Sequence, residues 1–173
     1  MAEALSPMLP DHIERVAHQV LEEACRRDLA IATAESCTGG LIASLLTDVP
    51  GCSHAFERGF VTYTDAAKIE LLGVAGATLQ REGPVSEAAA REMVAGALSR
   101  SAADIALAVT GWMEQGPDAD QPAGRVWFAA ACRGAEPVAL LREFGNRGRA
   151  ALRLACLEIA LTMLHEQMIA APS

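Results

Sequence analysis

The segment that most constrains the fold of this chain is TAESCTGG, residues 33–40. The apolar residues 29–34 that lead into it predict a short buried strand, and LIASLLTDV, residues 41–49, predicts a helix that ends at Pro50-Gly51. Between them, two glycines allow the backbone to come close to a ligand. We therefore expect a strand, a tight turn and a helix in direct succession, as in α/β proteins.

The alternation of strands and helices continues along the chain. Further helices are predicted over residues 11–28, 65–72, 87–101 and 147–168, and further strands over residues 56–63, 105–110, 126–132 and 138–144. The expected N-caps are Asp11, Thr64 or Asp65, Ser86 and Asn146. The last two strands form a hairpin that turns at residues 133–136. This order predicts a three-layer α/β/α sandwich with a mixed sheet and helices on both faces.

Composition sets the broad class. A length of 173 residues with 51% apolar residues favours one domain over residues 1–173, with its core in about 11–168. The net charge of −8 repels a phosphate backbone, so nucleic acid is not an expected partner. The chain shows neither a leader-like start nor about 18 consecutive apolar residues, so we expect a cytoplasmic protein without a membrane partner.

The five cysteines show no C-x-x-C spacing. A zinc site or a redox motif of that kind is therefore not predicted. We expect reduced thiols that serve as small core residues, and no metal or redox cofactor.

Ser36 is the candidate nucleophile because it lies at the turn where the strand gives way to the helix. Free N–H groups at such a helix start can hold a phosphate or a developing oxyanion. The pattern alone is weakly specific, since a serine in this position is also a common helix cap.

A nucleophilic serine needs a base. Histidine is the usual base, but His12, His18 and His165 fall on predicted helices, which leaves His54 in a loop. Lys68 offers another route, because a partly desolvated lysine loses its charge and can then accept a proton. Tyr63, at the end of the preceding strand, is predicted to reach the same crevice. The alternatives are a solvated helix charge for Lys68 and a half-buried strand residue for Tyr63.

Four separated blocks resemble one family. TAESCTGGLIASLLTDVPG, FERGFVTYTDAAKIELLGV, GPVSEAAAREMVAGAL and AVTG together look like the CinA C-terminal domain family, in the same order and over residues 11–165. The family also occurs fused behind another domain, so this chain resembles its stand-alone form.

The resemblance implies a function. The family includes enzymes that hydrolyse the amide of nicotinamide mononucleotide to nicotinic acid mononucleotide and ammonia. By resemblance, the catalytic serine, lysine and tyrosine are Ser36, Lys68 and Tyr63. The other substrate-binding positions implied are Thr38, Gly39 and Gly40 at the helix start, Thr110 and Gly111 after the third strand, and Arg147 in FGNR. The implied partner is a small-molecule nucleotide. The apolar last helix also suggests a homodimer.

The chain departs from the family after Thr110-Gly111. The family carries a Gly-rich loop there, whereas this chain has Trp112, Met113, Glu114 and Gln115 within the altered segment 112–121. These side chains are larger, and Glu114 would repel a phosphate. Either the loop serves another substrate, with Trp112 stacking on a ring, or catalysis has been lost and the fold kept.

Three rival functions stay open at this point. The first is a thiol enzyme that uses Cys37 with His54 as its base. The second is a binding or regulatory protein without turnover, which the altered loop favours. The third is DNA binding, for which Arg142, Arg147, Arg149 and Arg153 cluster near one helix start; such a cluster suits a single phosphate better.

Overall fold

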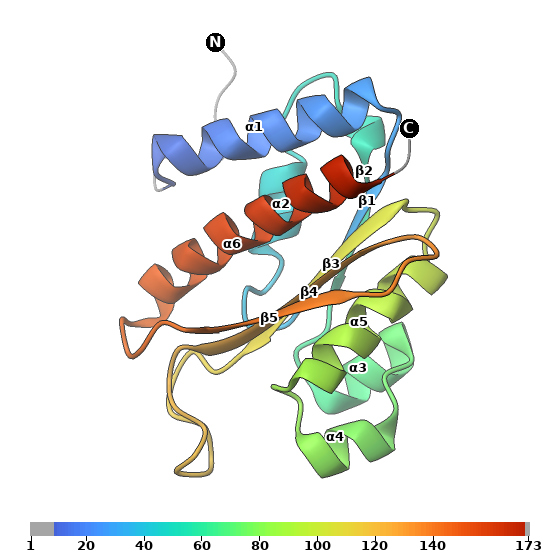
Figure 1. Cartoon of the computed structure of the whole chain (residues 1–173). Coiled ribbons are helices and arrows are strands. Elements are labelled where there is room, and N and C mark those ends of the chain that lie inside the picture. Colours follow the sequence, from blue (N-terminus) through green and yellow to red (C-terminus); the bar gives the residue numbers. More distant parts are fainter. Residues whose placement is uncertain (1–8, 172–173) are drawn as a thin grey trace.

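A five-stranded mixed sheet forms the centre of the protein in the computed structural model, which describes residues 9–171 (Figure 1). The strands are β1 (Ile31–Glu35), β2 (Phe56–Val61), β3 (Ile105–Gly111), β4 (Arg125–Cys132) and β5 (Val138–Glu143). Their order across the sheet is β2-β1-β3-β4-β5. Strands β1, β2 and β3 run parallel, whereas β4 and β5 are antiparallel to their neighbours, as the predicted hairpin requires.

Helices cover both faces of this sheet (Figure 1). Their bounds are α1 (Asp11–Arg26), α2 (Leu41–Leu46), η1 (Ser53–Ala55), α3 (Asp65–Leu72), α4 (Gly76–Glu82), α5 (Glu87–Ser99) and α6 (Arg149–Ala170). α1, α2 and α6 lie on one side, and α3, α4 and α5 lie on the other. The predicted three-layer α/β/α sandwich is confirmed. Within the described residues, no helix is both long and apolar enough to cross a bilayer.

Two helix starts follow the sequence and two do not. Thr64 Oγ1 accepts a hydrogen bond from the Ala67 N–H, and Ser86 Oγ accepts one from the Ala89 N–H, so both predicted N-caps are confirmed. Asp11 is not a cap, because Pro10 occupies the N-cap position of α1. Asn146 is not a cap either, because α6 begins only after Gly148.

The late start of α6 has a backbone cause. Gly145 has a φ of 71° and Gly148 a φ of 80°, so the chain turns through left-handed conformations on both sides of Asn146. A helix cannot run through those angles. The predicted helix therefore loses its first residues.

Helix α4 was not predicted from the sequence. Its N-cap residue is Ala75, whose side chain offers no hydrogen bond. Glu92 of α5 supplies the missing acceptor, since its carboxylate accepts bonds from the Ala75 N–H at 2.7 Å and from Thr78 Oγ1 at 2.6 Å. The cap comes from another helix, so no local signal marks this start.

Each face of the sheet has its own apolar core. The core between the sheet and α1, α2 and α6 contains large aliphatic side chains, whereas the core beneath α5 is rich in alanine. The buried positions of α6 pack within the chain against α1 and the sheet. The apolar sides of α6, which suggested a homodimer, are therefore largely covered by the chain itself, and the homodimer stays a prediction. All five cysteines are free thiols.

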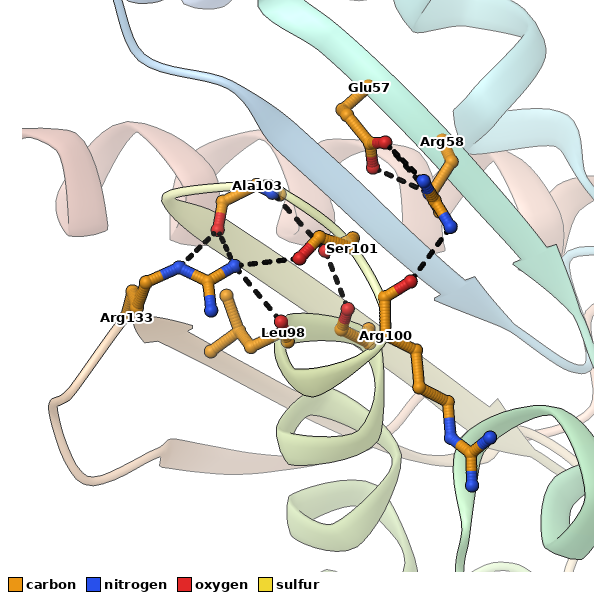
Figure 2. A network of polar contacts seen from close by, with 8 residues as sticks. Glu57, Arg58, Leu98, Arg100, Ser101, Ala103 and Arg133 are labelled. Carbon is orange, nitrogen blue, oxygen red and sulfur yellow. Dashed lines mark hydrogen bonds and ion pairs between the residues drawn. The ribbon is translucent and has the colours of Figure 1, made fainter.

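Two arginines, one in a strand and one in the hairpin turn, bind the segment that leads from α5 into β3 (Figure 2). Arg133, in the turn of the hairpin, donates to the carbonyl oxygens of Leu98, Ser101 and Ala103. Arg58 of β2 donates to the Arg100 carbonyl at 2.8 Å and pairs with Glu57. The last carbonyls of α5 and of its following loop thus have side-chain partners, which fixes the entry to the central strand β3.

We predict that Gly96→Ala destabilises the fold strongly. A Cβ at Gly96 would lie 2.0 Å from the carbonyl oxygen of Leu72, so α5 and the end of α3 would have to separate. We expect the free energy of unfolding to fall by about 3 kcal/mol, measured by chemical denaturation.

Gly76→Ala is the matched control. There a Cβ would meet only the Ile69 side chain, at 3.7 Å, so we expect a change of less than about 1 kcal/mol. Equal effects of the two substitutions would contradict the close-packing argument.

Candidate active site

A cavity opens where the parallel strands end. Ser36 follows β1, Tyr63 comes two residues after β2, and Thr110 and Gly111 close β3, so all four line the same cavity. The crevice outside the carboxyl ends of parallel strands is the usual ligand site of such sheets. The remaining lining comes from α3, α6 and three connecting segments: Cys37, Asp65, Lys68, Pro84, Val85, Trp112, Met113, Glu114, Gln115 and Arg149.

Ser36 and Lys68 form the chemical centre of the cavity. The Lys68 Nζ atom lies 3.1 Å from Ser36 Oγ and donates to the Thr62 carbonyl oxygen at 3.0 Å. Ser36 is 7% exposed and Lys68 only 1%. The predicted crevice therefore exists, and Lys68 is buried in it instead of lying in solvent.

Burial changes the protonation of Lys68. Desolvation lowers the pKa of Lys68, while the charges of Asp65 and Cys37 act in the opposite direction. A lysine with a lowered pKa is neutral more often at a given pH, and a neutral amine can accept a proton from the adjacent hydroxyl. The Thr62 carbonyl holds the amine beside the Ser36 hydroxyl.

Glu35 shapes the turn that carries Ser36. Its side chain is fully buried, and its carboxylate accepts hydrogen bonds from the N–H groups of Gly40, Ile42 and Ala43 at 3.1, 3.1 and 2.8 Å. Thr38 Oγ1 also donates to it, at 2.7 Å. These are the orphan donors of a helix start, so Glu35 caps α2 from the preceding strand.

This cap alters the interpretation of the helix start. Thr38, Gly39 and Gly40 were predicted to bind a phosphate or an oxyanion, but none of the three lines the cavity. The Gly40 N–H is already bonded to Glu35, and the Gly39 N–H is bonded to the Ser36 carbonyl at 3.1 Å. Gly39 and Gly40 instead adopt φ angles of 65° and 90°, which form the turn that presents Ser36.

The predicted arginine cluster does not stay together. Arg149 lines the cavity, whereas Arg147, two residues before it, is exposed and does not. Arg153 donates to the Cys37 carbonyl at 3.2 Å and so ties α6 to the turn after Ser36. Arg142 donates to its neighbour, the Leu141 carbonyl. The resemblance of FGNR to the family motif implied Arg147 as the ligand contact, whereas the arginine that lines the cavity is Arg149, the first residue of α6.

Arg149 has partners at the mouth of the cavity. It donates to Glu114 at 2.7 Å. The hydrogen bonds with Glu114 and with Tyr63 raise the pKa of Arg149, so it keeps its positive charge. Tyr63 itself is 65% exposed, which places its hydroxyl at the rim and not in the core.

The altered loop is part of the cavity wall. Met113 is buried in the core beneath α6 and anchors the segment, while Trp112 is fixed by backbone bonds to Arg125 and Gly124. Glu114 and Gln115 are exposed. At the other wall, Thr110 Oγ1 donates to the Pro84 carbonyl at 2.8 Å, which joins β3 to the loop before α5.

The thiol alternative lacks its base. Cys37 lines the cavity, but His54 lies exposed in η1 and is not part of the lining. The thiol of Cys37 shares a hydrogen bond with the thiol of Cys156, and this bond and burial raise the pKa of Cys156. In the described part of the chain, no three or more His, Cys, Asp or Glu side chains are grouped to hold a metal ion.

Comparison with known proteins gives the class. The model of the CinA C-terminal domain matches residues 13–168, and the chain belongs to this family. The solved structure of the competence/damage inducible protein CihA from Agrobacterium tumefaciens superposes with a TM-score of 0.88 at 41% sequence identity, covering 94% of this chain and 99% of that one.

Two relatives of known name show a similar sequence. A nicotinamide-nucleotide amidohydrolase, PncC of Escherichia coli K12, is 39% identical over 165 residues, which is 94% of this chain and 98% of that protein. A CinA-like protein of Akkermansia muciniphila is 54% identical over 112 residues, or 64% of this chain. That match spans only 27% of the relative, so this chain corresponds to about a quarter of its length.

We predict that Glu35→Gln destabilises the protein. The glutamine amide carries no negative charge, and its NH₂ group replaces one of the two carboxylate oxygens. That NH₂ group faces N–H donors of α2, so the helix loses part of its cap. The free energy of unfolding should fall by about 3 kcal/mol. Glu82→Gln, at an exposed carboxylate paired with Arg81, should cost less than about 1 kcal/mol in the same denaturation assay. Equal losses would show that the Glu35 cap has no special role.

Proposed function

We propose that this protein hydrolyses the carboxamide of nicotinamide mononucleotide, giving nicotinic acid mononucleotide and ammonia. The observation that carries the proposal is the buried Lys68 amine 3.1 Å from the Ser36 hydroxyl, inside a cavity at the carboxyl ends of the strands. The similarity to an amidohydrolase over nearly the whole length of both chains supports this substrate.

Ser36 and Lys68 divide the chemistry between them. Ser36 Oγ forms a bond to the carboxamide carbon, and its proton passes to the neutral Lys68 amine. The carbonyl electron pair moves to oxygen and then returns to break the C–N bond, while Lys68 supplies the proton that leaves with ammonia. Water attacks the resulting ester by the same route, which restores Ser36 and releases the carboxylate.

A backbone group next to the nucleophile suits the developing oxyanion. Cys37 follows Ser36 and lines the cavity, and the hydrogen bonds of the described residues leave its N–H without a partner. We propose this N–H as one donor to the carbonyl oxygen in the transition state. The role predicted for the helix-start glycines thus moves to the residue directly after the serine.

The rim of the cavity suits the rest of a nucleotide. We propose Arg149, in place of Arg147, as the cation for the phosphate, with Tyr63 beside it. Thr110 and Gly111 form the wall toward the substrate ring. The single domain, the homodimer and the cytoplasmic location stay predictions.

A second candidate is a protein that binds a nucleotide without turning it over. It is favoured by the loop at the cavity, where the Glu114 carboxylate already occupies Arg149 at 2.7 Å. Thermal stabilisation by nicotinamide mononucleotide without release of ammonia would support this function over the first.

Removal of the nucleophile should abolish hydrolysis. We expect Ser36→Ala to release no ammonia above background, because Ser36 is the one hydroxyl among residues 9–171 that is hydrogen-bonded to the Lys68 amine. Lys68→Met should lower kcat at least about a hundredfold by removing the base. Ser44→Ala, at an exposed serine of α2, is the control that keeps wild-type turnover. Full activity of Ser36→Ala would refute the assignment.

The pH dependence should follow Lys68. Its neutral form is the base, so kcat/KM should rise as the pH is raised through its pKa and level off at a pH below the ordinary lysine value. The charge of Asp65 raises that pKa, so Asp65→Asn should move the rising limb to lower pH. Glu70→Gln, at an exposed residue of the same helix, should leave it in place. A limb that does not move in Asp65→Asn would contradict the assignment of the limb to Lys68.

A further inference from the structure

The cavity contains an ion pair that the reaction itself does not require. Glu114, in the loop after β3, accepts a hydrogen bond from Arg149 of α6 at 2.7 Å. Both residues line the cavity. Their side chains are 75% and 40% exposed, so the pair faces the solvent at the cavity mouth.

The charges of the lining show what this pair controls. Four of the lining residues are acidic or basic: Asp65, Lys68, Glu114 and Arg149. Lys68 is buried and committed to Ser36 and to the Thr62 carbonyl. Among the lining residues, Arg149 is therefore the cation that an incoming anionic group can reach, and Glu114 already holds it.

The pair is weak enough to exchange. Ion pairs between exposed side chains contribute little to stability, because water screens them and the side chains lose freedom. A phosphate carries more charge than a carboxylate and offers three acceptor oxygens to the fork of an arginine. A phosphate can therefore replace Glu114 on Arg149, but it then lies beside the displaced carboxylate, which repels it.

The loop keeps the carboxylate near that position. Met113 directly before Glu114 is buried in the core, and the backbone N–H of Trp112 is bonded to the Arg125 carbonyl at 2.9 Å. Glu114 thus extends from an anchored segment and remains close to Arg149 after displacement.

We propose that Glu114 sets the affinity of this site for phosphate-bearing ligands by competing with their phosphate for Arg149. The nucleotide identity of the ligand rests on the proposed function, whereas the competition for an anion does not. The consequence is weak binding of both substrate and product, which favours release of the product.

Inorganic phosphate is the probe, because it tests the competition without any catalysis. Its dissociation constant would be measured by isothermal titration calorimetry, with the midpoint of thermal unfolding as a second readout. We expect Glu114→Gln to bind phosphate about three- to fivefold more tightly than the wild type, the gain that removing an exposed ion-pair partner allows. Arg149→Gln and the double variant should both lose the binding, since the gain acts through Arg149.

Glu23→Gln is the matched control. It removes the same charge from another exposed pair, with Arg26 on α1, outside the cavity. It should leave the affinity for phosphate unchanged. An equal gain in Glu23→Gln would attribute the effect to net charge and overturn the proposal. Unchanged or weaker binding by Glu114→Gln, or binding that survives in the double variant, would overturn it as well.

Turnover separates this inference from the proposed function. If the protein is an amidase, Glu114→Gln should lower KM for nicotinamide mononucleotide about three- to fivefold and leave KM for nicotinamide riboside, which lacks the phosphate, unchanged. An equal change for both substrates would overturn the competition model. Absence of turnover in every variant would refute the amidase function, while the phosphate titration would still decide the role of Glu114.

Discussion

The site depends first on one buried carboxylate. Glu35 ends β1 and caps α2, so a single side chain joins the strand before Ser36, the proposed nucleophile, to the helix after it. A helix start without such a partner would leave several buried N–H groups unsatisfied or would take up an anion from solution. Because Glu35 satisfies them internally, the turn is held from within, and the bond from Arg153 to the Cys37 carbonyl ties it to α6 as well.

Burial lowers the pKa of Lys68, on which the proposed reactivity of the site depends. Lys68 comes from α3, and its position against the turn removes its amine from water, which lowers its pKa. The carbonyl of Thr62 orients the same amine. A charged lysine in this buried position would cost free energy. Burial therefore favours the neutral amine next to Ser36. The desolvation that makes burial of Lys68 costly is thus the same effect that suits Lys68 to its proposed role as a base.

The charged side chains at the mouth of the cavity are exposed, unlike those of Glu35 and Lys68. These side chains, Arg149 and Glu114, come from α6 and a loop, so they can change without disturbing the turn or the core. Glu35 and Lys68, by contrast, are held by several contacts each. The fold therefore separates a well-held pair, Ser36 and Lys68, from a rim whose charges we propose to set ligand affinity.

Local signals in the sequence determined the order of the elements, because strands, turns and caps such as Ser86 act over a few neighbouring residues. They also predicted that Ser36 and Lys68 would meet, since Ser36 follows one strand and Lys68 lies in the helix that follows the next strand. Only the tertiary structure decided that Glu92 caps α4, that Glu35 occupies the start of α2, and that Arg149 instead of Arg147 reaches the cavity. The first and third depend on contacts between different elements of the fold, and the Glu35 cap depends on how β1 turns into α2. Periodicity and spacing do not encode either.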